Sequence, residues 1–105
     1  MKADMFRLDG KVVAVIGAGG GIGAAVARGV AAQGGHAICY DVNAETAAAT
    51  AAAIRAAGGT ATSAALDITD EAGVNAAFDA VVTDHGRLDG LACTPAINVR
   101  KPILK

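Results

Sequence analysis

The spacing of apolar positions changes along this chain, and each spacing predicts a different element. Residues 11–16 (KVVAVI) are apolar without alternation, which is typical of a strand covered on both faces in a parallel sheet. From Ile22 to Gln33 the apolar residues recur at helical spacing, and Gly34-Gly35 ends that helix. Residues 36–41 (HAICYD) indicate a second strand.

The rest of the chain continues this alternation of helices and strands. We predict an alanine-rich helix from the cap Asn43 to about Ala57, a strand over residues 60–66, a helix from the cap Thr69 to Gly86, and a strand over residues 88–94. The last helix should bury five apolar side chains: Val74, Ala77, Phe78, Val81 and Val82. This order predicts an α/β fold, a Rossmann-type parallel sheet with strand order 3-2-1-4 and flanking helices.

We expect residues 1–105 to form a single domain that is incomplete at its C-terminal end. A doubly wound sheet usually continues beyond a fourth strand, which would otherwise be an open, apolar edge. The chain is therefore expected to be the first part of a larger domain, or to have a partner on that edge, as in a homo-oligomer.

Composition narrows the classes of function. The chain is 53% apolar with a net charge of −1, and its basic residues are interspersed with acidic ones, so neither nucleic acid nor a membrane is an expected partner. Residues 1–10 lack the apolar core expected of a signal peptide, and the longest apolar run near the start, residues 12–16, is too short to span a bilayer. Cys39 and Cys93 should be small buried residues on strands too far apart for a disulfide, and free thiols favour the cytoplasm.

Glycines dominate the segment between the first strand and the first helix. Residues 17–23 fit a G-x-x-x-G-x-G pattern in which Gly17 permits a sharp turn, Gly21 leaves room for a pyrophosphate, and Gly23 allows close helix packing. The helix N-terminus would then face two phosphates. The candidate cofactor-binding residues here are Gly17, Gly19, Gly20, Gly21, Ile22 and Gly23. The predicted strand before this segment and the predicted helix after it favour a nucleotide site over a structural turn. No Gly-Lys-Ser/Thr follows the glycines, which excludes a phosphate-loop NTPase.

An acid follows the second strand at the same predicted edge of the sheet. The carboxylate of Asp41 can accept hydrogen bonds from both hydroxyls of the adenosine ribose, and its charge would repel the 2′-phosphate of NADP. Neither residues 18–20 nor Val42 supplies a basic side chain for that phosphate. NAD is therefore the preferred cofactor over NADP. The alternative is that Asp41 only starts a turn before Asn43.

A second acid, Asp67, follows the third strand. It could hydrogen-bond the adenine amino group while Ile68 packs on the ring, or it could simply lead into the next helix. The two histidines, His36 and His85, have no evident partner ligands, so we predict no metal site.

Together these residues resemble the short-chain dehydrogenase/reductase superfamily. The resemblance runs from Leu8-Asp9-Gly10-Lys11, through the glycine motif and both acids, to Leu88-Asp89-Gly90-Leu91. The family's T-G-x-x-x-G-I-G motif falls on residues 16–23, with Ile16 in place of threonine. Where the family carries N-N-A-G, this chain has Cys93-Thr94-Pro95-Ala96, which leaves Thr94 and the backbone there to contact the cofactor.

The resemblance implies an NAD(H)-dependent oxidoreductase that transfers hydride between a nicotinamide and an alcohol or ketone. The family's catalytic serine and Y-x-x-x-K pair have no counterpart, because Tyr40 is the only tyrosine and no lysine follows it at that spacing. We therefore expect no catalytic residue and no hydride transfer by these 105 residues alone. The alternatives are a non-catalytic dinucleotide-binding remnant and an S-adenosylmethionine-dependent methyltransferase, a fold that commonly has an acid where this chain has Val15-Ile16.

Overall fold

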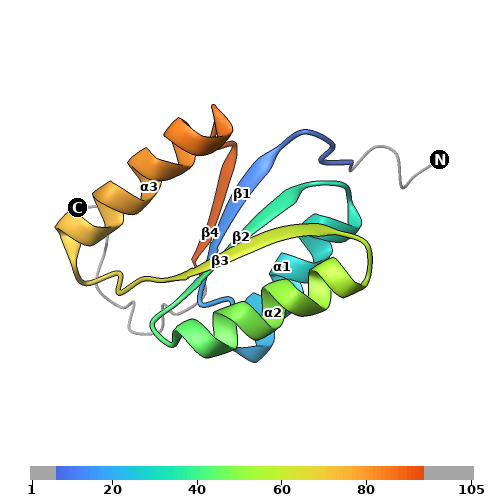
Figure 1. Cartoon of the computed structure of the whole chain (residues 1–105), viewed down its shortest axis with the longest axis horizontal. Coiled ribbons are helices and arrows are strands. Elements are labelled where there is room, and N and C mark those ends of the chain that lie inside the picture. The colour runs from blue at the N-terminus through green and yellow to red at the C-terminus, as the bar shows by residue number, and fades with distance from the viewer. Residues whose placement is uncertain (1–6, 94–105) are drawn as a thin grey trace.

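Four parallel strands form the sheet at the centre of the structure (Figure 1). The computed structural model describes residues 7–93. The strands are β1 (Val12–Ile16), β2 (His36–Asp41), β3 (Thr60–Ala65) and β4 (Gly90–Cys93). Their order, β3-β2-β1-β4, with every neighbouring pair parallel, confirms the predicted strand order. On β1, Ala14 and Val15 point to opposite faces and both are fully buried, as its continuous apolar sequence predicts.

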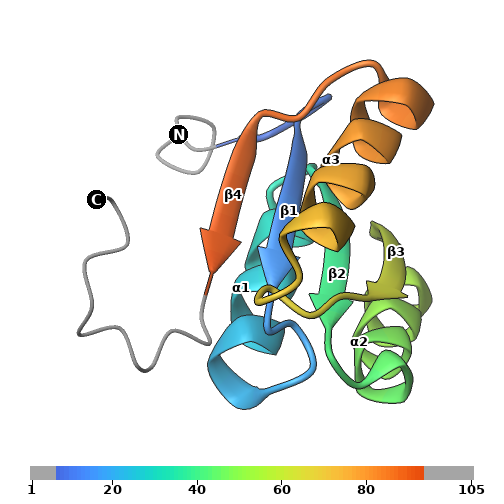
Figure 2. The same cartoon turned by 90° about the vertical axis from the view of Figure 1, so that its left-hand side faces the viewer.

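Helices cover both faces of this sheet. α1 (Gly21–Ala32) and α2 (Ala44–Ala56) lie on one face, and α3 (Glu71–His85) lies on the other (Figures 1 and 2). Each face has its own apolar core, one around Val15 and Ile54 and the other around Ile38 and Val81. The parallel strands therefore end at one edge of the sheet, where β1 and β2 lead into the helices of the first face.

Side-chain and glycine caps set the ends of the second and third helices. The Asn43 side chain caps α2 by accepting hydrogen bonds from the backbone N–H groups of Glu45 and Thr46, at 2.9 and 3.3 Å. Gly86 ends α3 with a φ of 79°, in the left-handed region that favours glycine. Both of these helix ends are as predicted.

The start of α3 and its buried face differ from the prediction. Asp70, not Thr69, is the cap, because its carboxylate accepts from the Gly73 N–H at 3.0 Å while the Thr69 hydroxyl donates to Asp67. Of the five side chains expected to be buried, Val81 is buried and Val74, Ala77 and Phe78 pack partly buried against the same core, but Val82 is 51% exposed. Consecutive residues lie on different sides of a helix, so a single line of contact cannot bury both Val81 and Val82.

The fourth strand is shorter than predicted and leaves one edge of the sheet unpaired within residues 7–93. It begins at Gly90 rather than Leu88, and Thr94 lies outside the described residues. Across that range β4 pairs only with β1, and Leu91 is 54% exposed. Cys39 and Cys93 are both free thiols, as predicted, but only Cys39 is buried. The burial expected for Cys93 is wrong, because Cys93 is the last residue of β4 and lies outside both apolar cores of the described residues.

Candidate functional site

The glycine turn leaves β1 sharply and is fastened to the end of β2. Gly17 has a φ of 89°, a conformation that side chains disfavour. The N–H groups of Gly17 and Ala18 both donate to the carbonyl oxygen of Tyr40, at 2.8 and 2.9 Å. The Gly20 N–H donates to the Gly17 carbonyl at 3.2 Å. These bonds hold the turn at the carboxyl edge of the sheet.

The N-terminus of α1 is open to solvent. Its cap residue, Gly20, contributes no side-chain hydrogen bond, and the helical bonding begins with the Ala24 N–H, which donates to the Gly20 carbonyl at 2.7 Å. A Cβ added to Gly21 would meet nothing within 4 Å, and Ile22 is 75% exposed. Uncapped N–H groups at the positive end of a helix dipole favour a bound anion. Gly23 is buried in the same helix, in keeping with the close packing predicted for it.

The Asp41 side chain is directed at the glycine turn. Its Oδ2 accepts a hydrogen bond from the Gly19 N–H at 2.9 Å, and its Oδ1 accepts from the Asn43 N–H at 3.1 Å. The second bond is the turn role considered as an alternative, so Asp41 starts the turn and also faces the glycines. A carboxylate has about four acceptor positions, so both oxygens keep capacity for further donors.

A hollow of about 280 Å³ lies between these elements at the carboxyl edge. It brings together five of the predicted site residues: Gly17, Asp41, Val42, Asp67 and Ile68. Ile16, Leu66 and Thr69 complete its walls. Val42 and Ile68 are 71% and 41% exposed, and together they give the hollow an apolar rim. Thr94, the remaining predicted contact, lies outside the described residues.

Thr69 orients Asp67 within this hollow. The Asp67 Oδ1 accepts from the Thr69 hydroxyl at 2.6 Å and from the Thr69 N–H at 2.9 Å. These hydrogen bonds lower the pKa of Asp67 below its usual value, which keeps the side chain a carboxylate, able only to accept. From the sequence, Thr69 was expected to act only as the cap of the third helix. Its hydroxyl instead fixes an acid that faces the same hollow as Asp41.

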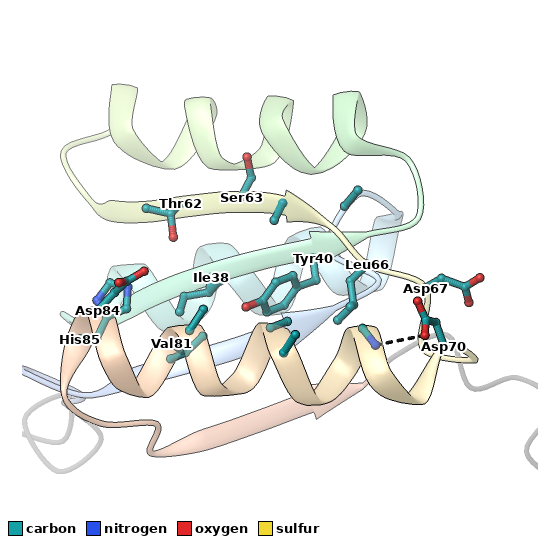
Figure 3. A pocket seen from close by; sticks show the side chains of 16 residues that line it. Ile38, Tyr40, Thr62, Ser63, Leu66, Asp67, Asp70, Val81, Asp84 and His85 are labelled. Carbon is teal, nitrogen blue, oxygen red and sulfur yellow. Dashed lines mark hydrogen bonds between the residues drawn. The ribbon is translucent and has the colours of Figure 1, made fainter.

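A second, larger hollow of about 570 Å³ lies on the other face of the sheet, between α3 and strands β2 and β3 (Figure 3). Tyr40 lies in it, and burial raises the pKa of its phenol. At its far end the His36 and His85 rings are 4.6 Å apart, and burial, with the nearby His85, lowers the pKa of His36. Across residues 7–93 no cluster of three acidic, histidine or cysteine side chains is placed to hold a metal ion. Of the predicted site residues that the structure describes, only Asp67 borders this hollow.

Two threonines of α2 that were not among the predicted site residues lie behind the glycine turn. The buried Thr50 hydroxyl donates to the Ala18 carbonyl at 2.9 Å, and Thr46 packs directly against Gly19. A threonine on the buried face of an alanine-rich helix is the only sequence signal for this role. That signal does not identify a partner so distant in the chain.

Comparison with known proteins identifies the family. Residues 11–105 match the family model of short chain dehydrogenases. The chain is 48% identical over 84 residues to D-threitol dehydrogenase of Mycolicibacterium smegmatis, covering 80% of this chain and 32% of that enzyme. It is 36% identical over 87 residues to 7alpha-hydroxysteroid dehydrogenase of Escherichia coli, covering 83% of this chain and 34% of that enzyme. The chain thus spans about a third of the length of these curated relatives.

Solved structures agree with this assignment. The crystal structure of hydroxysteroid dehydrogenase from Escherichia coli matches with a TM-score of 0.83 and 35% identity, over 87% of this chain and 39% of that one. A metagenomic short-chain oxidoreductase in complex with NADP matches with a TM-score of 0.77 and 38% identity, over 80% of this chain and 38% of that one. The chain belongs to the short chain dehydrogenase family, whose members are oxidoreductases that bind a nicotinamide dinucleotide. The resemblance drawn from the sequence is confirmed, and the methyltransferase alternative is set aside.

No helix within residues 7–93 is both long enough and apolar enough to cross a bilayer.

Proposed function

We propose that this chain holds the adenosine diphosphate half of NAD in a dehydrogenase that acts on an alcohol or a ketone. The observation that carries the proposal is the 2.9 Å hydrogen bond between the Gly19 N–H and Asp41 Oδ2. It joins the glycine turn to the carboxylate at the edge where ligands of open α/β sheets bind. A phosphate-binding segment and a sugar-binding acid therefore lie side by side.

The start of α1 fits a diphosphate. The N–H groups of Gly21, Ile22 and Gly23 would hold the phosphate oxygens, because no side chain caps this end of the helix and a Cβ at Gly21 would enter empty space. When bound, the dinucleotide supplies the nicotinamide carbon that gives or takes the hydride. The residues described here contribute binding and orientation to that chemistry.

The adenosine would occupy the hollow between Asp41 and Asp67. The exposed side chains of Val42 and Ile68 give the flat adenine ring apolar surface on which to pack. The Asp67 carboxylate would accept a hydrogen bond from the adenine amino group. Its Thr69 bonds both reach Oδ1, so Oδ2 is the oxygen for that contact.

The preference for NAD over NADP rests on the charge of Asp41. Its carboxylate would accept from the ribose hydroxyls but repel a 2′-phosphate at the same place. Among residues 7–93, the walls of the hollow contain no lysine or arginine to offset that repulsion. The family includes a relative solved in complex with NADP, so family membership does not choose between the two cofactors and the proposed preference rests on Asp41 alone.

Calorimetric titration of the chain with NAD and with NADP tests the proposal, with S-adenosylmethionine as the negative control. We expect NAD to bind at least about tenfold more tightly than NADP, which corresponds to about 1.4 kcal/mol. Equal affinities would contradict the ribose role of Asp41. Binding of S-adenosylmethionine alone would contradict the dinucleotide site altogether.

The substrate and the oligomer are further parts of the same proposal. The relatives named above are dehydrogenases of D-threitol and of a hydroxysteroid, which supports a small-molecule alcohol or ketone as substrate. Within residues 7–93 no strand pairs with the outer edge of β4, which supports pairing with further strands or with a second copy of the protein. Acid/base groups for the reaction would come from outside residues 7–93.

A further inference from the structure

One peptide unit of the glycine turn is held at both of its polar ends. The Ala18 carbonyl accepts from the Thr50 hydroxyl at 2.9 Å, and the N–H of the same unit, on Gly19, donates to Asp41 Oδ2 at 2.9 Å. The unit is trans, so its C=O and N–H point in opposite directions. Two partners on opposite sides therefore fix the rotation of this peptide plane.

Thr50 occupies a position where a polar side chain requires a specific partner. It lies within α2, is 7% exposed, and shares its face with Ala47, Ala51 and Ile54. A threonine inside a helix often bonds the carbonyl one turn before it. Here the hydroxyl instead reaches a residue 32 positions away, in the glycine turn. Ala18 is fully buried, so its carbonyl would have no ready replacement for this bond.

The turn also rests directly on the first turns of α2. A Cβ added to Gly19 would lie 2.7 Å from the Cβ of Thr46 and 3.0 Å from Asp41 Oδ2. Real Cβ atoms essentially never show the first of these distances, and the second is unusually tight, so the turn lies closely against α2 with no space for a side chain at position 19. The orientation of the Gly19 N–H therefore depends on the contacts that α2 makes.

We propose that Thr50 is a positioning residue for dinucleotide binding. By holding the Ala18 carbonyl, its hydroxyl aims the Gly19 N–H at Asp41 and fixes the carboxylate that receives the ribose. Thr50 lies behind the turn and makes no contact with the proposed cofactor. This inference rests on the proposed function only for its effect on affinity, because the geometry of the turn exists without a nucleotide.

Three variants separate the hydroxyl of Thr50 from its packing. Thr50→Val keeps the volume and removes the hydroxyl, Thr50→Ser keeps the hydroxyl and removes a methyl group, and Thr83→Val makes the same change at an exposed position of α3. For each, calorimetry gives the Kd for NAD and for NADP. Amide hydrogen exchange by NMR, without nucleotide, gives the protection of the Gly19 N–H relative to that of Cys39 in the sheet.

We expect Thr50→Val to speed exchange at Gly19 about tenfold relative to Cys39 and to raise the Kd for NAD about fivefold to tenfold. The Kd for NADP should rise less, because Asp41 contributes less to binding NADP. The ratio of the NADP Kd to the NAD Kd should therefore fall. Thr50→Ser should restore both measurements to near the wild-type values. Thr83→Val should leave them unchanged.

Two sets of results would overturn the inference. One is unchanged Gly19 exchange and NAD affinity in Thr50→Val. The other is a loss in Thr50→Ser as large as in Thr50→Val, or an equal loss of both nucleotides, either of which assigns Thr50 to packing alone. If the wild-type chain binds no NAD, the proposed function fails, and the exchange at Gly19 alone decides whether Thr50 positions the turn.

Discussion

Replacing Asp41 by asparagine tests the electrostatic part of the account with little change of shape. In the structure each oxygen of this carboxylate already accepts one backbone N–H, from Gly19 at 2.9 Å and from Asn43 at 3.1 Å. An asparagine can keep the Gly19 bond through its carbonyl oxygen but carries no charge and presents an NH₂ group in place of the second acceptor. The turn should therefore remain in place while the ribose site changes.

Asp41→Asn should weaken the binding of NAD and strengthen the binding of NADP, and the two changes together set the expected shift in the ratio of affinities. A hydrogen bond to a charged group contributes about 1.5–3 kcal/mol, so NAD should lose about 1–2 kcal/mol at this half-exposed position. For NADP, a phosphate charge about 5 Å from the carboxylate is repelled by about 1–3 kcal/mol, depending on the effective dielectric, and Asp41→Asn removes that repulsion. The ratio of the two affinities should consequently shift by about 2 kcal/mol or more, roughly 30-fold toward NADP.

The assay is calorimetric titration of wild type and variant with both nucleotides at low and at high salt. Asp70→Asn is the matched control, because it makes the same change at a helix cap where asparagine serves as well as aspartate and which does not border the smaller hollow. The control should leave the ratio unchanged. High salt should reduce the discrimination of wild type against NADP. If the ratio of the NAD and NADP affinities in Asp41→Asn stayed within twofold of the wild-type ratio, the charge of Asp41 would not determine the preference for NAD.

Three further predictions follow from the contacts described. Gly21→Ala should leave the free energy of unfolding in urea near the wild-type value, because its Cβ enters open space, but it should weaken NAD binding. Gly19→Ala should lower both the free energy of unfolding and the affinity for NAD, because its Cβ would collide with Thr46. Hydrogen bonds from Arg87 and from the Val12 N–H lower the pKa of Asp89 from 3.8 to about 2, so the stability they contribute is complete above pH 3.8 and is lost toward pH 2. Asp89→Asn should flatten that part of a stability–pH curve. Burial lowers the pKa of His36 below 6.5, so stability should fall as the pH drops below 6.5, and His36→Gln should remove that decrease.

Much of this fold could be predicted because glycines and caps mark its element boundaries. Gly34 and Gly86 end helices in left-handed conformations, and Asn43 caps α2, each at the predicted place. The cap of α3 was assigned to the wrong residue because Thr69 and Asp70 are both good caps. The Asp67 carboxylate, two residues before Thr69, engages the Thr69 hydroxyl, and Asp70 caps the helix instead.

The candidate site could likewise be predicted only in part from the sequence. The edge shared by Gly17, Asp41 and Asp67 follows from strand polarity, since parallel strands end together, and sequence order alone predicts it. The supporting bond from Thr50 to Ala18 depends on how α2 lies against the turn, which no local pattern encodes. Likewise, Val81 and Val82 are equivalent in sequence, and only the packing of α3 on the sheet buries one and exposes the other.

The central claim is that the open start of α1 and the hollow between Asp41 and Ile68 receive the adenosine diphosphate half of a dinucleotide. An NMR titration of the ¹⁵N-labelled chain with ADP-ribose tests it residue by residue. We predict that the largest amide shifts fall at Gly21, Ile22 and Gly23 and at Val42 and Ile68. Shifts confined to the larger hollow between α3 and β3, or no shifts at millimolar ligand, would contradict the claim.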